Sequence, residues 1–419
     1  MNINWFISSK VRHASHMHKH VWKLLCAQRD LLSPKAIEPV ERALGELDKV
    51  CRGPMDKSAL DKEMSNLETV ANQWLKPYPS PALRENIEVL LVAIAVAMAI
   101  RTFVAQPFKI PTGSMQPTLY GVTSNPDLSN TDITSKPELK PDPDFEVPNR
   151  IKRFFLYWFT GVSYEHVIAK ADGSMLATAD DPKRFLLFNL KQDFVVGGQP
   201  YTVWFPPDKF LQRAGLVDRY GRVNTNSFKA GDDIVKMMSY SGDHLFVDRV
   251  TYNFRRPRRG EIVVFETKNI SRMESDQLGQ FYIKRLVALG GEKVQIGDDR
   301  HLVIDGKRLD ASTPHFAGVY SFDSSTHPQD SHYSGHVNQI TGRTQAGRGN
   351  LAPLFENASS VFDVPPGHYM VMGDNTVNSS DSRTWGSFPR ENVIGKSLCV
   401  YWPFGKQDGR KNRFGLTRE

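Results

Sequence analysis

The longest apolar stretch of the chain runs from Ile87 to Ala105. Its centre, Val89–Ile100, holds 12 residues without a charge, and Glu88 and Arg101 stand at its edges. A transmembrane helix needs about 20 mostly apolar residues, and long charged side chains near its ends can reach the membrane interface. The pattern predicts either one membrane span or a buried core helix, and its length alone does not separate the two.

Residues 1–86 show apolar positions at helical spacing, for example at Val21, Leu24 and Leu25. Ser33-Pro34 and Gly53-Pro54 predict breaks between helices, and Pro77–Pro81 predicts a linker. We therefore expect a small helical region before the apolar stretch. Four histidines have no carboxylate or cysteine close by to complete a metal site, so we interpret them as a solvated helix face; they are His13, His16, His18 and His20.

After Phe108 the pattern changes to short runs typical of strands, with a turn at Asp305-Gly306. The runs are Glu261–Phe265, Lys293–Ile296, Leu302–Ile304, Tyr369–Met372 and Ser397–Trp402. Two segments rich in turn-forming residues, Pro126–Pro148 and Asp310–Asn350, predict loop-rich inserts. The pattern predicts a mainly β domain in this part of the chain.

Composition narrows the class of protein. With 40% hydrophobic and 24% charged residues, the 419-residue chain has a globular balance, which argues against wholesale disorder. Three scattered cysteines exclude a disulfide-built scaffold and make a structural zinc site improbable. The net charge of +7 selects no partner. The basic run Arg255–Arg259 suits anionic headgroups or a solvated hairpin end equally well, and no nucleic-acid-binding motif accompanies it.

A candidate nucleophile follows directly after the apolar stretch. Prolines at 107, 111 and 117 favour extended backbone, and Gly113 lets the chain turn tightly beside Ser114. A serine in such a rigid turn suits nucleophilic attack. A second copy of the tripeptide, Gly173-Ser174-Met175, lacks the Pro-Thr-Leu that follows Ser114, and we interpret it as an ordinary turn.

A serine nucleophile needs a base, and the sequence offers Lys284 within the apolar run Phe281–Gly291. Burial disfavours the ammonium form, and the charge of the adjacent Arg285 acts in the same direction. Lowering a lysine pKa from about 10.4 to about 8 corresponds to about 3 kcal/mol. The alternative is a surface lysine on an amphipathic strand.

A third cluster, Gly373–Gly386, packs small, polar and charged residues between two strand-like runs. Asp381 and Arg383 can pair across a turn, and Ser379 can form a hydrogen bond within the fold. A polar hairpin loop would explain the glycine, asparagine and aspartate residues as well, but not the other two segments.

Five segments in this order, together with the apolar stretch, resemble type I signal peptidases, which are membrane-anchored Ser–Lys endopeptidases. The segments are PTGSMQPTLYG (Pro111–Gly121), GDHLFVDRV (Gly242–Val250), RRGEIVVF (Arg258–Phe265), YIKRLVALGGE (Tyr282–Glu292) and GDNTVNSSDSRTWG (Gly373–Gly386). They and the apolar stretch cover about 70 of the 419 residues. The resemblance implies a signal-peptidase-like β fold with an inserted β-rich cap, following one transmembrane helix.

The resemblance also implies roles for particular residues. Ser114 matches the nucleophile and Lys284 the general base, while the Thr112 hydroxyl and the Ser114 N–H match the oxyanion site. Ser379 matches the serine that orients the lysine, and Asp381 and Arg383 match a supporting ion pair. Positions that line the pockets for small substrate residues are Phe108, Ile110, Pro111, Met115, Leu119 and Tyr282. The family requires no metal and no cofactor.

Under this interpretation the protein removes signal peptides from exported preproteins, cleaving after a small residue in an Ala-x-Ala-like pattern. We expect residues 1–86 to be cytoplasmic, residues 87–105 to span a bacterial-type cytoplasmic membrane, and residues 106–419 to form an extracytoplasmic peptidase domain. Ser114 lies nine residues beyond Ala105, which puts it near the membrane surface where a signal peptide leaves its cleavage site. Segment Phe108–Pro111 can pair with the substrate as an added strand. The partners are then preproteins and the lipid bilayer, with no nucleic acid.

Two inserts, at residues 122–240 and 310–362, depart from simpler members of the family. We interpret the first as a β region with its own small core; the alternative is that its aromatic run Phe154–Phe159, behind Lys152 and Arg153, dips into the membrane interface. The second insert we interpret as a surface loop rather than a metal site, although it carries four histidines, His315, His327, His332 and His336.

Two other functions compete with signal peptide removal. A Ser–Lys self-cleaving repressor-type protease shares the catalytic logic, but the apolar stretch and the lack of a DNA-binding module argue against it. A membrane-anchored, non-catalytic β domain that binds exported chains is the other. Such a binding module has no need for a buried lysine.

Overall fold

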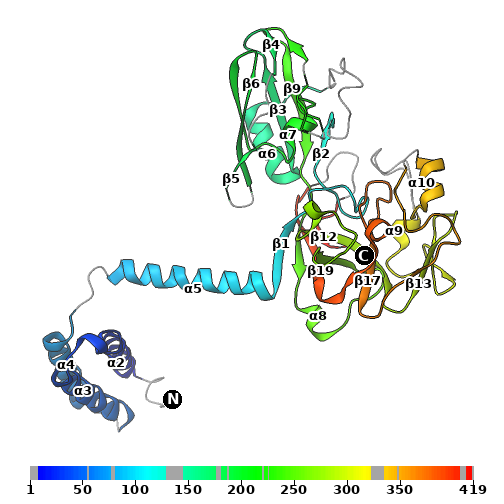
Figure 1. Ribbon diagram of the computed structural model, residues 1–419. Helices are drawn as coiled ribbons and strands as arrows, with labels where there is room; N and C mark the ends of the chain where they lie inside the picture. Colours follow the sequence, from blue (N-terminus) through cyan, green and yellow to red (C-terminus); the bar gives the residue numbers. More distant parts are fainter. Residues whose placement is uncertain are drawn as a thin grey trace. The chain divides into compact units, whose positions relative to one another are not determined.

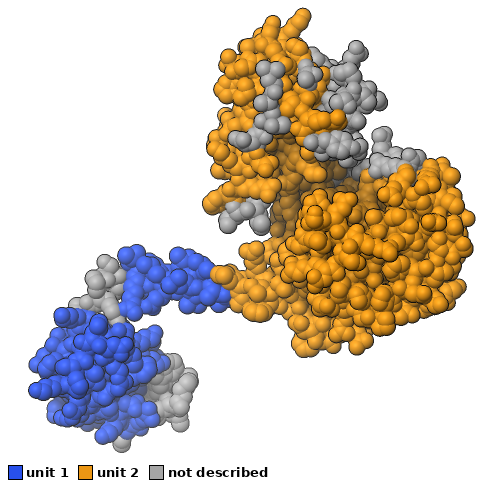
Figure 2. Space-filling view, viewed as in Figure 1, with its two compact units in different colours: residues 1–96 blue, residues 97–419 orange. Residues whose placement is uncertain are grey.

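The computed structural model describes residues 8–53, 56–76, 81–128, 145–175, 181–185, 188–218, 221–224, 226–321, 335–346, 349–405 and 412–417. The chain divides into two compact units, Met1–Val96 and Ala97–Glu419 (Figure 2). The linker predicted at Pro77–Pro81 lies, apart from its last residue, outside the described residues.

The first unit contains a helical bundle. Its helices are α2 (Ser9–Gln28), the short η1 (Arg29–Leu31), α3 (Pro34–Arg52) and α4 (Lys57–Trp74). The two predicted breaks coincide with the ends of α3, where Pro34 occupies the first turn and Gly53 follows the last residue. Apolar side chains spaced by three and four residues on α3, such as Val40, Leu44 and Leu47, face the bundle core and are at most 4% exposed.

The apolar stretch forms α5 (Pro81–Phe103), which begins earlier than the predicted span and ends before Ala105. Strand β1 starts at Ala105 instead, because Pro107 cannot continue a helix. The segment Leu83–Phe103 is long and apolar enough to cross a membrane, and none of it is buried within the protein. The apolar side chains of α5 therefore contribute to no core in the described structure, unlike those of a soluble core helix.

The second unit is built on one antiparallel sheet with the order β1-β10-β19-β11-β12-β17-β18, and β20 pairs with β19 (Figure 1). These strands are β1 (Ala105–Lys109), β10 (His244–Asp248), β11 (Ile262–Glu266), β12 (Phe281–Leu289), β17 (His368–Met372), β18 (Phe388–Pro389), β19 (Val393–Trp402) and β20 (Gly415–Leu416). The strands predicted at 261–265, 369–372 and 397–402 are thus confirmed within a few residues. Short helical turns connect them: α8 (Thr251–Phe254), η3 (Ser275–Gln277), α11 (Ser382–Trp385) and η4 (Arg390–Asn392).

This sheet curls on itself. In a flat sheet β1 and β12 would lie four strand spacings apart, or about 19 Å. Yet Phe108 of β1 and Phe281 of β12 make an edge-to-face ring contact with centroids 5.4 Å apart. The curl brings the edge strand β1, and the serine turn that follows it, opposite β12.

The first insert has a core of its own, as predicted, formed by residues such as Met175, Phe194 and Phe210. Its strands are β2 (Thr123–Asn125), β3 (Val162–Ile168), β4 (Gly173–Ser174), β5 (Lys183–Phe185), β6 (Phe188–Val196), β7 (Gln199–Trp204), β8 (Ser227–Phe228) and β9 (Asp233–Tyr240), and its short helix is α7 (Phe210–Arg213). They form small sheets, the largest being β2-β9-β3 and β5-β6-β7. The aromatic run Phe154–Phe159 is not part of this β structure, because it lies in helix α6 (Arg150–Thr160). Most of the predicted loop Pro126–Pro148 lies outside the described residues.

In its described parts the second insert is not a surface loop, and this interpretation was wrong there. Phe316, Val319 and Phe355 are at most 2% exposed and share a core with strands of the sheet β15-β14-β13-β16. The strands β13 (Lys293–Ile296), β14 (Leu302–Ile304) and β15 (Lys307–Arg308) precede the insert. The insert itself contains α9 (Ala317–Tyr320) and α10 (Gln339–Ala346), and β16 (Phe362–Asp363) begins at its last residue. The abundance of glycine and serine predicted a loop, but a few large apolar residues pack into the core and fix the segment. His336 is fully buried, His315 is exposed, and His327 and His332 lie outside the described residues.

Candidate active site

Ser114 sits in a turn that its neighbours anchor in the core. Met115 and Leu119 are at most 1% exposed and pack with Ile110 among side chains of β10 and β11. Asn375 binds the same turn through two hydrogen bonds. Its backbone N–H donates to the Ser114 carbonyl at 3.0 Å, and its Nδ2 donates to the Gly113 carbonyl at 3.0 Å. The serine is therefore held by packing below and hydrogen bonds beside it.

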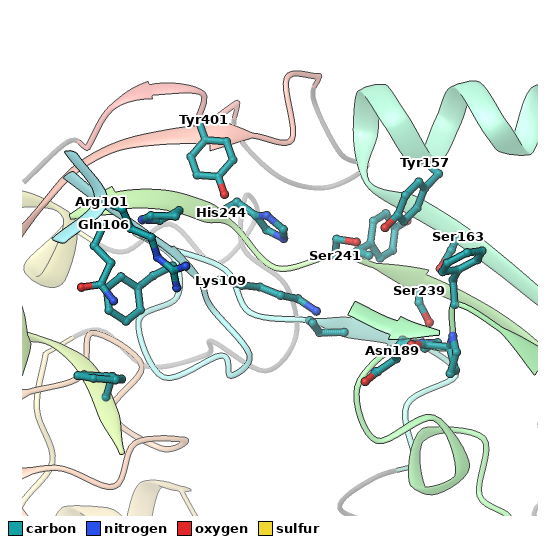
Figure 3. Close-up of a pocket in the computed structure, with 18 residues that line it drawn as sticks. Arg101, Gln106, Lys109, Tyr157, Ser163, Asn189, Ser239, Ser241, His244 and Tyr401 are labelled. Atoms are coloured by element: carbon teal, nitrogen blue, oxygen red, sulfur yellow. Dashed lines mark hydrogen bonds between the residues drawn. The ribbon is translucent and has the colours of Figure 1, made fainter. Parts of the chain in front are cut away.

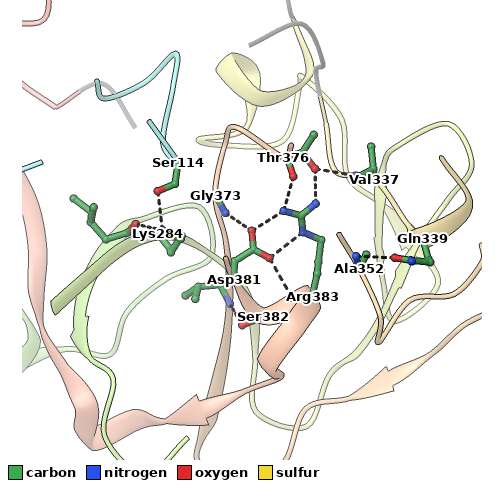
Figure 4. A network of polar contacts seen from close by, with 12 residues as sticks. Ser114, Lys284, Val337, Gln339, Ala352, Gly373, Thr376, Asp381, Ser382 and Arg383 are labelled. Carbon is green, nitrogen blue, oxygen red and sulfur yellow. Dashed lines mark hydrogen bonds and ion pairs between the residues drawn. The ribbon is translucent and has the colours of Figure 1, made fainter. Parts of the chain in front are cut away.

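Lys284 reaches this serine from β12 (Figure 4). Its Nζ donates to Ser114 Oγ at 2.8 Å and to its neighbour's carbonyl, Ile283 O, at 3.1 Å. Both residues of the pair are only 5% exposed. The Tyr282 ring centroid lies 5.3 Å from Nζ and helps to cover the amine. The two residues, 170 positions apart in the sequence, therefore lie in direct contact away from bulk water.

Burial lowers the pKa of Lys284 to about 8. The carboxylates of Asp381 and Asp374 act against this shift, whereas the Arg383 guanidinium adds to it. We expected Arg285 to supply the positive charge, but that side chain is paired elsewhere. A substantial fraction of the amine is thus uncharged near pH 8 and able to accept a proton.

Asp381 and Arg383 form the ion pair that their spacing predicted. Nε and Nη2 of Arg383 donate to the two carboxylate oxygens at 2.9 and 2.8 Å, and both side chains are fully buried. Burial disfavours the charged carboxylate, yet the adjacent Arg383 holds the pKa of Asp381 below its ordinary value. Arg383 also donates to the Thr376 hydroxyl at 2.6 Å, so the pair fixes the shape of the whole Gly373–Gly386 loop (Figure 4).

A second buried ion pair escaped the sequence analysis. Nε and Nη2 of Arg285 donate to the Asp374 carboxylate at 2.8 and 2.7 Å, and the Thr118 hydroxyl donates to the same carboxylate. This ties β12 to the segment that follows the serine turn. The signal was present, because Asp374 stands at the end of a strand beside Asn375, but nothing in the sequence identified Arg285 as its partner.

Gly373 allows the loop to touch the serine turn. A Cβ at this position would lie 2.4 Å from the Ser114 carbonyl oxygen and 2.3 Å from Ser379 Oγ, which no side chain tolerates. Ser379 is therefore close to the turn and 8% exposed, but its hydroxyl is not among the hydrogen-bond partners of Lys284 within the described residues.

The sequence predicted two oxyanion donors, the Thr112 hydroxyl and the Ser114 N–H. The Thr112 side chain is exposed, two residues before the serine. The backbone N–H of Ser114 donates to no acceptor in the described part of the chain. Gly121 packs against the backbone of Thr112, where a Cβ would lie 2.2 Å from its carbonyl carbon. The close packing of Gly121 therefore holds the backbone of Thr112 in place, while its side chain remains accessible.

The six predicted pocket residues divide into two groups. Ile110, Met115 and Leu119 are buried in the core beneath the serine turn. The other three stay accessible to different degrees: Phe108 and Tyr282 are half-buried and Pro111 is exposed. Only the second group presents side-chain surface to a ligand in this structure.

A groove of about 450 Å³ runs along β1 (Figure 3). Four consecutive β1 residues, Gln106–Lys109, line it together with Phe281 of β12, and the insert supplies its other side through residues such as Tyr157 and Phe205. Because side chains alternate between the faces of a strand, four residues in a row indicate that the groove follows the strand edge. It begins at Arg101, in the last turn of α5, and reaches Phe281, three residues before Lys284.

The backbone of β1 leaves this edge open. Ile110 N donates to Asp243 O at 2.9 Å, and Arg249 N donates to Val104 O at 3.0 Å, so the even-numbered residues between them face β10. Pro107 and Lys109 therefore turn their backbone groups toward the groove. Lys109 Nζ also bonds Asp208 of the insert at 2.8 Å.

The basic run and the second Gly-Ser-Met copy have structural partners. Arg255 and Arg259 form ion pairs with Glu261 and Glu292, which favours the hairpin-end interpretation of this run. Ser174 lies in β4, paired with β8. Among the described residues, no group of three or more histidine, cysteine, aspartate or glutamate side chains is arranged to hold a metal ion.

Comparison with known proteins agrees with these observations. The family model "Signal peptidase, peptidase S26" matches residues 83–124 and 235–402, just over half of the chain. The gap between the two matched ranges falls within the first insert.

Individual relatives match the same part of the chain. The chain is 28% identical to a signal peptidase I of Leptolyngbya laminosa over 39% of its own length and 62% of the relative, and 31% identical to a probable signal peptidase I-1 of Synechocystis over 39% and 63%. It thus spans just under two thirds of these relatives. A solved signal peptidase I of Enterococcus faecalis shares 24% identity, covering 34% of this chain and 97% of that one, with a TM-score of 0.21.

Proposed function

The chain belongs to the peptidase S26 family of signal peptidases, and we propose that it removes signal peptides from exported preproteins, with Ser114 as nucleophile and Lys284 as general base. One observation carries this proposal: the 2.8 Å contact between Lys284 Nζ and Ser114 Oγ, in a site that lowers the pKa of the amine to about 8. A purely structural lysine has no need of either property.

In the proposed reaction, uncharged Lys284 takes the proton from Ser114 Oγ as that oxygen attacks the carbonyl carbon of a small substrate residue. The carbonyl oxygen becomes an oxyanion, which the Ser114 N–H and the Thr112 hydroxyl stabilise by hydrogen bonds. The protonated amine then gives its proton to the leaving nitrogen. In the second half of the reaction Lys284 activates the water that hydrolyses the acyl-enzyme.

The residues around the pair act as positioning residues in this proposal. The Asp381–Arg383 ion pair fixes the loop that carries Ser379 and presses Gly373 against the serine turn. In this proposal the Ser379 hydroxyl orients the amine when substrate is bound. The two buried ion pairs beside the site, Arg285–Asp374 and Arg383–Asp381, leave the Lys284 amine as the group that exchanges a proton in this proposal.

The substrate runs along the open edge of β1 in the groove, in the same direction as β1. Its upstream end then lies near Arg101, where α5 ends. The substrate continues past Lys109, so that its scissile bond reaches Ser114, which follows β1 in the sequence. The accessible Phe108, Pro111 and Tyr282 contact its side chains. The buried Ile110, Met115 and Leu119 set the shape of the pocket from below, which limits it to small residues.

Helix α5 anchors the protein in the membrane as a single span. In this arrangement the helical region 1–86 is cytoplasmic and the peptidase domain, 106–419, is extracytoplasmic. The absence of burial along Leu83–Phe103 supports the span over a core helix. The remaining alternative, a non-catalytic domain that binds exported chains, is disfavoured because it leaves the Ser114–Lys284 contact without a purpose.

The test is to incubate the full chain, purified in detergent, with a preprotein and to sequence the new N-terminus. We expect one cut after a small residue at the end of the signal peptide, and no cut by Lys284→Ala. Lys284→Arg is the matched control for charge: it keeps a cation at this position and should also be inactive, because guanidinium does not deprotonate. Cleavage by either variant would refute the role of the lysine.

A further inference from the structure

Helix α6 displays its apolar side toward the surroundings instead of the protein. We propose that α6 lies flat in the headgroup layer of the membrane that α5 crosses, with its aromatic side chains inserted at the acyl boundary. This inference rests on the proposed membrane span but not on the cleavage chemistry.

The orientation of α6 is the reverse of that of an ordinary amphipathic helix. Five large apolar side chains occur at spacings of three and four residues, so they form one stripe along the helix. All five are between 53% and 72% exposed: Ile151, Phe154, Phe155, Trp158 and Phe159. The face packed against the protein carries Arg153, Leu156, Tyr157 and Thr160, all half-buried, and no residue of α6 is fully buried.

The exposed stripe is not a frayed segment, because α6 is fixed at both ends. Asn149 caps its start, accepting from Lys152 N at 2.9 Å, and Gly161 ends it in the left-handed conformation with φ 68°. The Trp402 indole donates to the Trp158 carbonyl at 2.8 Å. Gly405 N donates to the Phe159 carbonyl at 2.8 Å. The protein holds the stripe outward.

Five exposed aromatic and aliphatic side chains in one stripe indicate a surface that contacts another molecule or a membrane. Isolated exposed apolar residues are common on protein surfaces, but contiguous patches mark interaction sites. Two further exposed rings occur near the C-terminal end of α6: Phe404 precedes Gly405, whose N–H bonds the Phe159 carbonyl, and it packs against Phe414 with ring centroids 5.4 Å apart.

The charges around α6 select an anionic lipid surface. Arg150 and Lys152 are exposed in the first turn, which carries no acidic residue. Cations at a helix N-terminus oppose the helix dipole, so they do not stabilise the isolated helix. They do suit the phosphates of anionic headgroups above an inserted apolar face, which is the arrangement of interfacial helices.

The position of α6 fits the same occupant. Tyr157 on its inner face lines the groove that also contains Arg101, in the last turn of α5 (Figure 3). A membrane crossed by α5 has its surface near that turn. Helix α6, which carries the stripe, therefore lies close to the point where α5 leaves the membrane, and this position favours lipid over a soluble protein partner.

The test measures the depth of one α6 side chain in a bilayer. The full chain, with Cys26, Cys51 and Cys399 replaced by serine, receives Phe155→Cys and an environment-sensitive fluorophore, and is reconstituted in vesicles of phosphatidylcholine and phosphatidylglycerol. Lipids brominated along the acyl chain serve as quenchers. We expect a blue-shifted label whose emission falls at least about twofold with shallow bromines, and less so when phosphatidylglycerol is omitted.

The matched control is Ile340→Cys on α10, an apolar residue of similar exposure (49%) in the other insert, which should remain unquenched. No quenching at position 155, or equal quenching at 155 and 340, overturns the proposal. A blue-shifted but unquenched label that depends on the protein-to-lipid ratio identifies a second copy of this chain as the occupant, and also overturns it. Because no cleavage is measured, failure here is distinct from failure of the proposed peptidase activity.

A second variant links the surface to turnover. Phe155→Ser with Trp158→Ser removes apolar contact from the outward face only, so detergent-solubilised enzyme should cleave a preprotein at an unchanged rate. In anionic vesicles we expect cleavage to fall about tenfold. Equal rates for variant and parent protein in vesicles would argue against a membrane role for α6.

Discussion

The chain contains the tripeptide Gly-Ser-Met twice, and the two copies differ in what surrounds the serine side chain. Both bury the methionine: Met115 is 0% and Met175 1% exposed, each in the core of its own region. Both serine carbonyls accept a backbone hydrogen bond, from Asn375 N at 3.0 Å for Ser114 and from Gly197 N at 3.1 Å for Ser174. In both places the tripeptide therefore fixes the local backbone, through a buried methionine side chain and a hydrogen-bonded serine carbonyl.

The difference lies in what reaches each side chain from elsewhere in the chain. Lys284 of β12 donates from Nζ to Ser114 Oγ at 2.8 Å. The neighbouring charged residues form two ion pairs, Arg285–Asp374 and Arg383–Asp381. Ser174 is one residue of a two-residue strand, and its partner across the strand pair is Ser227. The comparison teaches that local sequence supplies a rigid turn, while the lysine contact that the proposed reaction requires comes from a distant strand.

The largest expected effect separates the two serines directly. Ser114→Ala should lower kcat/KM for a preprotein by at least about 10³-fold, because removal of a nucleophile leaves only residual catalysis. Ser174→Ala, the matched control, should leave the rate unchanged. The measurement is cleavage of a purified preprotein by both variants, with folding checked by thermal unfolding. If the two variants lost activity equally, the distinction between the copies would be wrong.

A smaller effect is expected at Thr112, which precedes Ser114 and has Asp172 as its counterpart before Gly173. Thr112→Ala should lower kcat by about 10²-fold with little change in KM, because an oxyanion donor acts only in the transition state. Thr112→Ser keeps the hydroxyl and should restore most of the rate. Steady-state kinetics on the two variants test this, and an unchanged kcat in the alanine variant would remove Thr112 from the mechanism.

The smallest effect is a pH dependence that tests whether the amine distinguishes Ser114. The active form of Lys284 is uncharged, so activity is lost as pH falls below its pKa of about 8. We expect kcat/KM to fall about tenfold per pH unit well below that value and to level off above it. A rate independent of pH between 6 and 9 would mean that another group takes the proton.

Much of the candidate site was predictable because its residues occur in compact segments. The Ser114 turn, the lysine strand and the Asp381–Arg383 loop each carry a local pattern, and their order matches a family. The partner of Arg285 was not predictable, because Asp374 lies 89 residues away and only the curled sheet and the loop bring the two together. The sequence instead suggested that Arg285 acts on Lys284, a role in which Arg383 is the relevant cation.

The inserts were predicted less well, for two physical reasons. Ile151, Phe154 and Phe155 already have helical spacing in the sequence, but the many aromatic residues of this run are typical of strands as well. In the second insert, a composition rich in glycine and serine outweighed single residues such as Phe316 and Phe355, although two buried rings are enough to fix a segment against a sheet. Average composition does not reveal such isolated anchors.

The close approach of Gly373 to Ser114 has a consequence for biosynthesis. Ser114 emerges from the ribosome early, but Lys284 follows 170 residues later, and the segment of Gly373 that packs against the serine turn later still. An incomplete chain thus carries Ser114 without the proposed base. Under the proposed function, the order of synthesis therefore keeps an unfinished chain inactive.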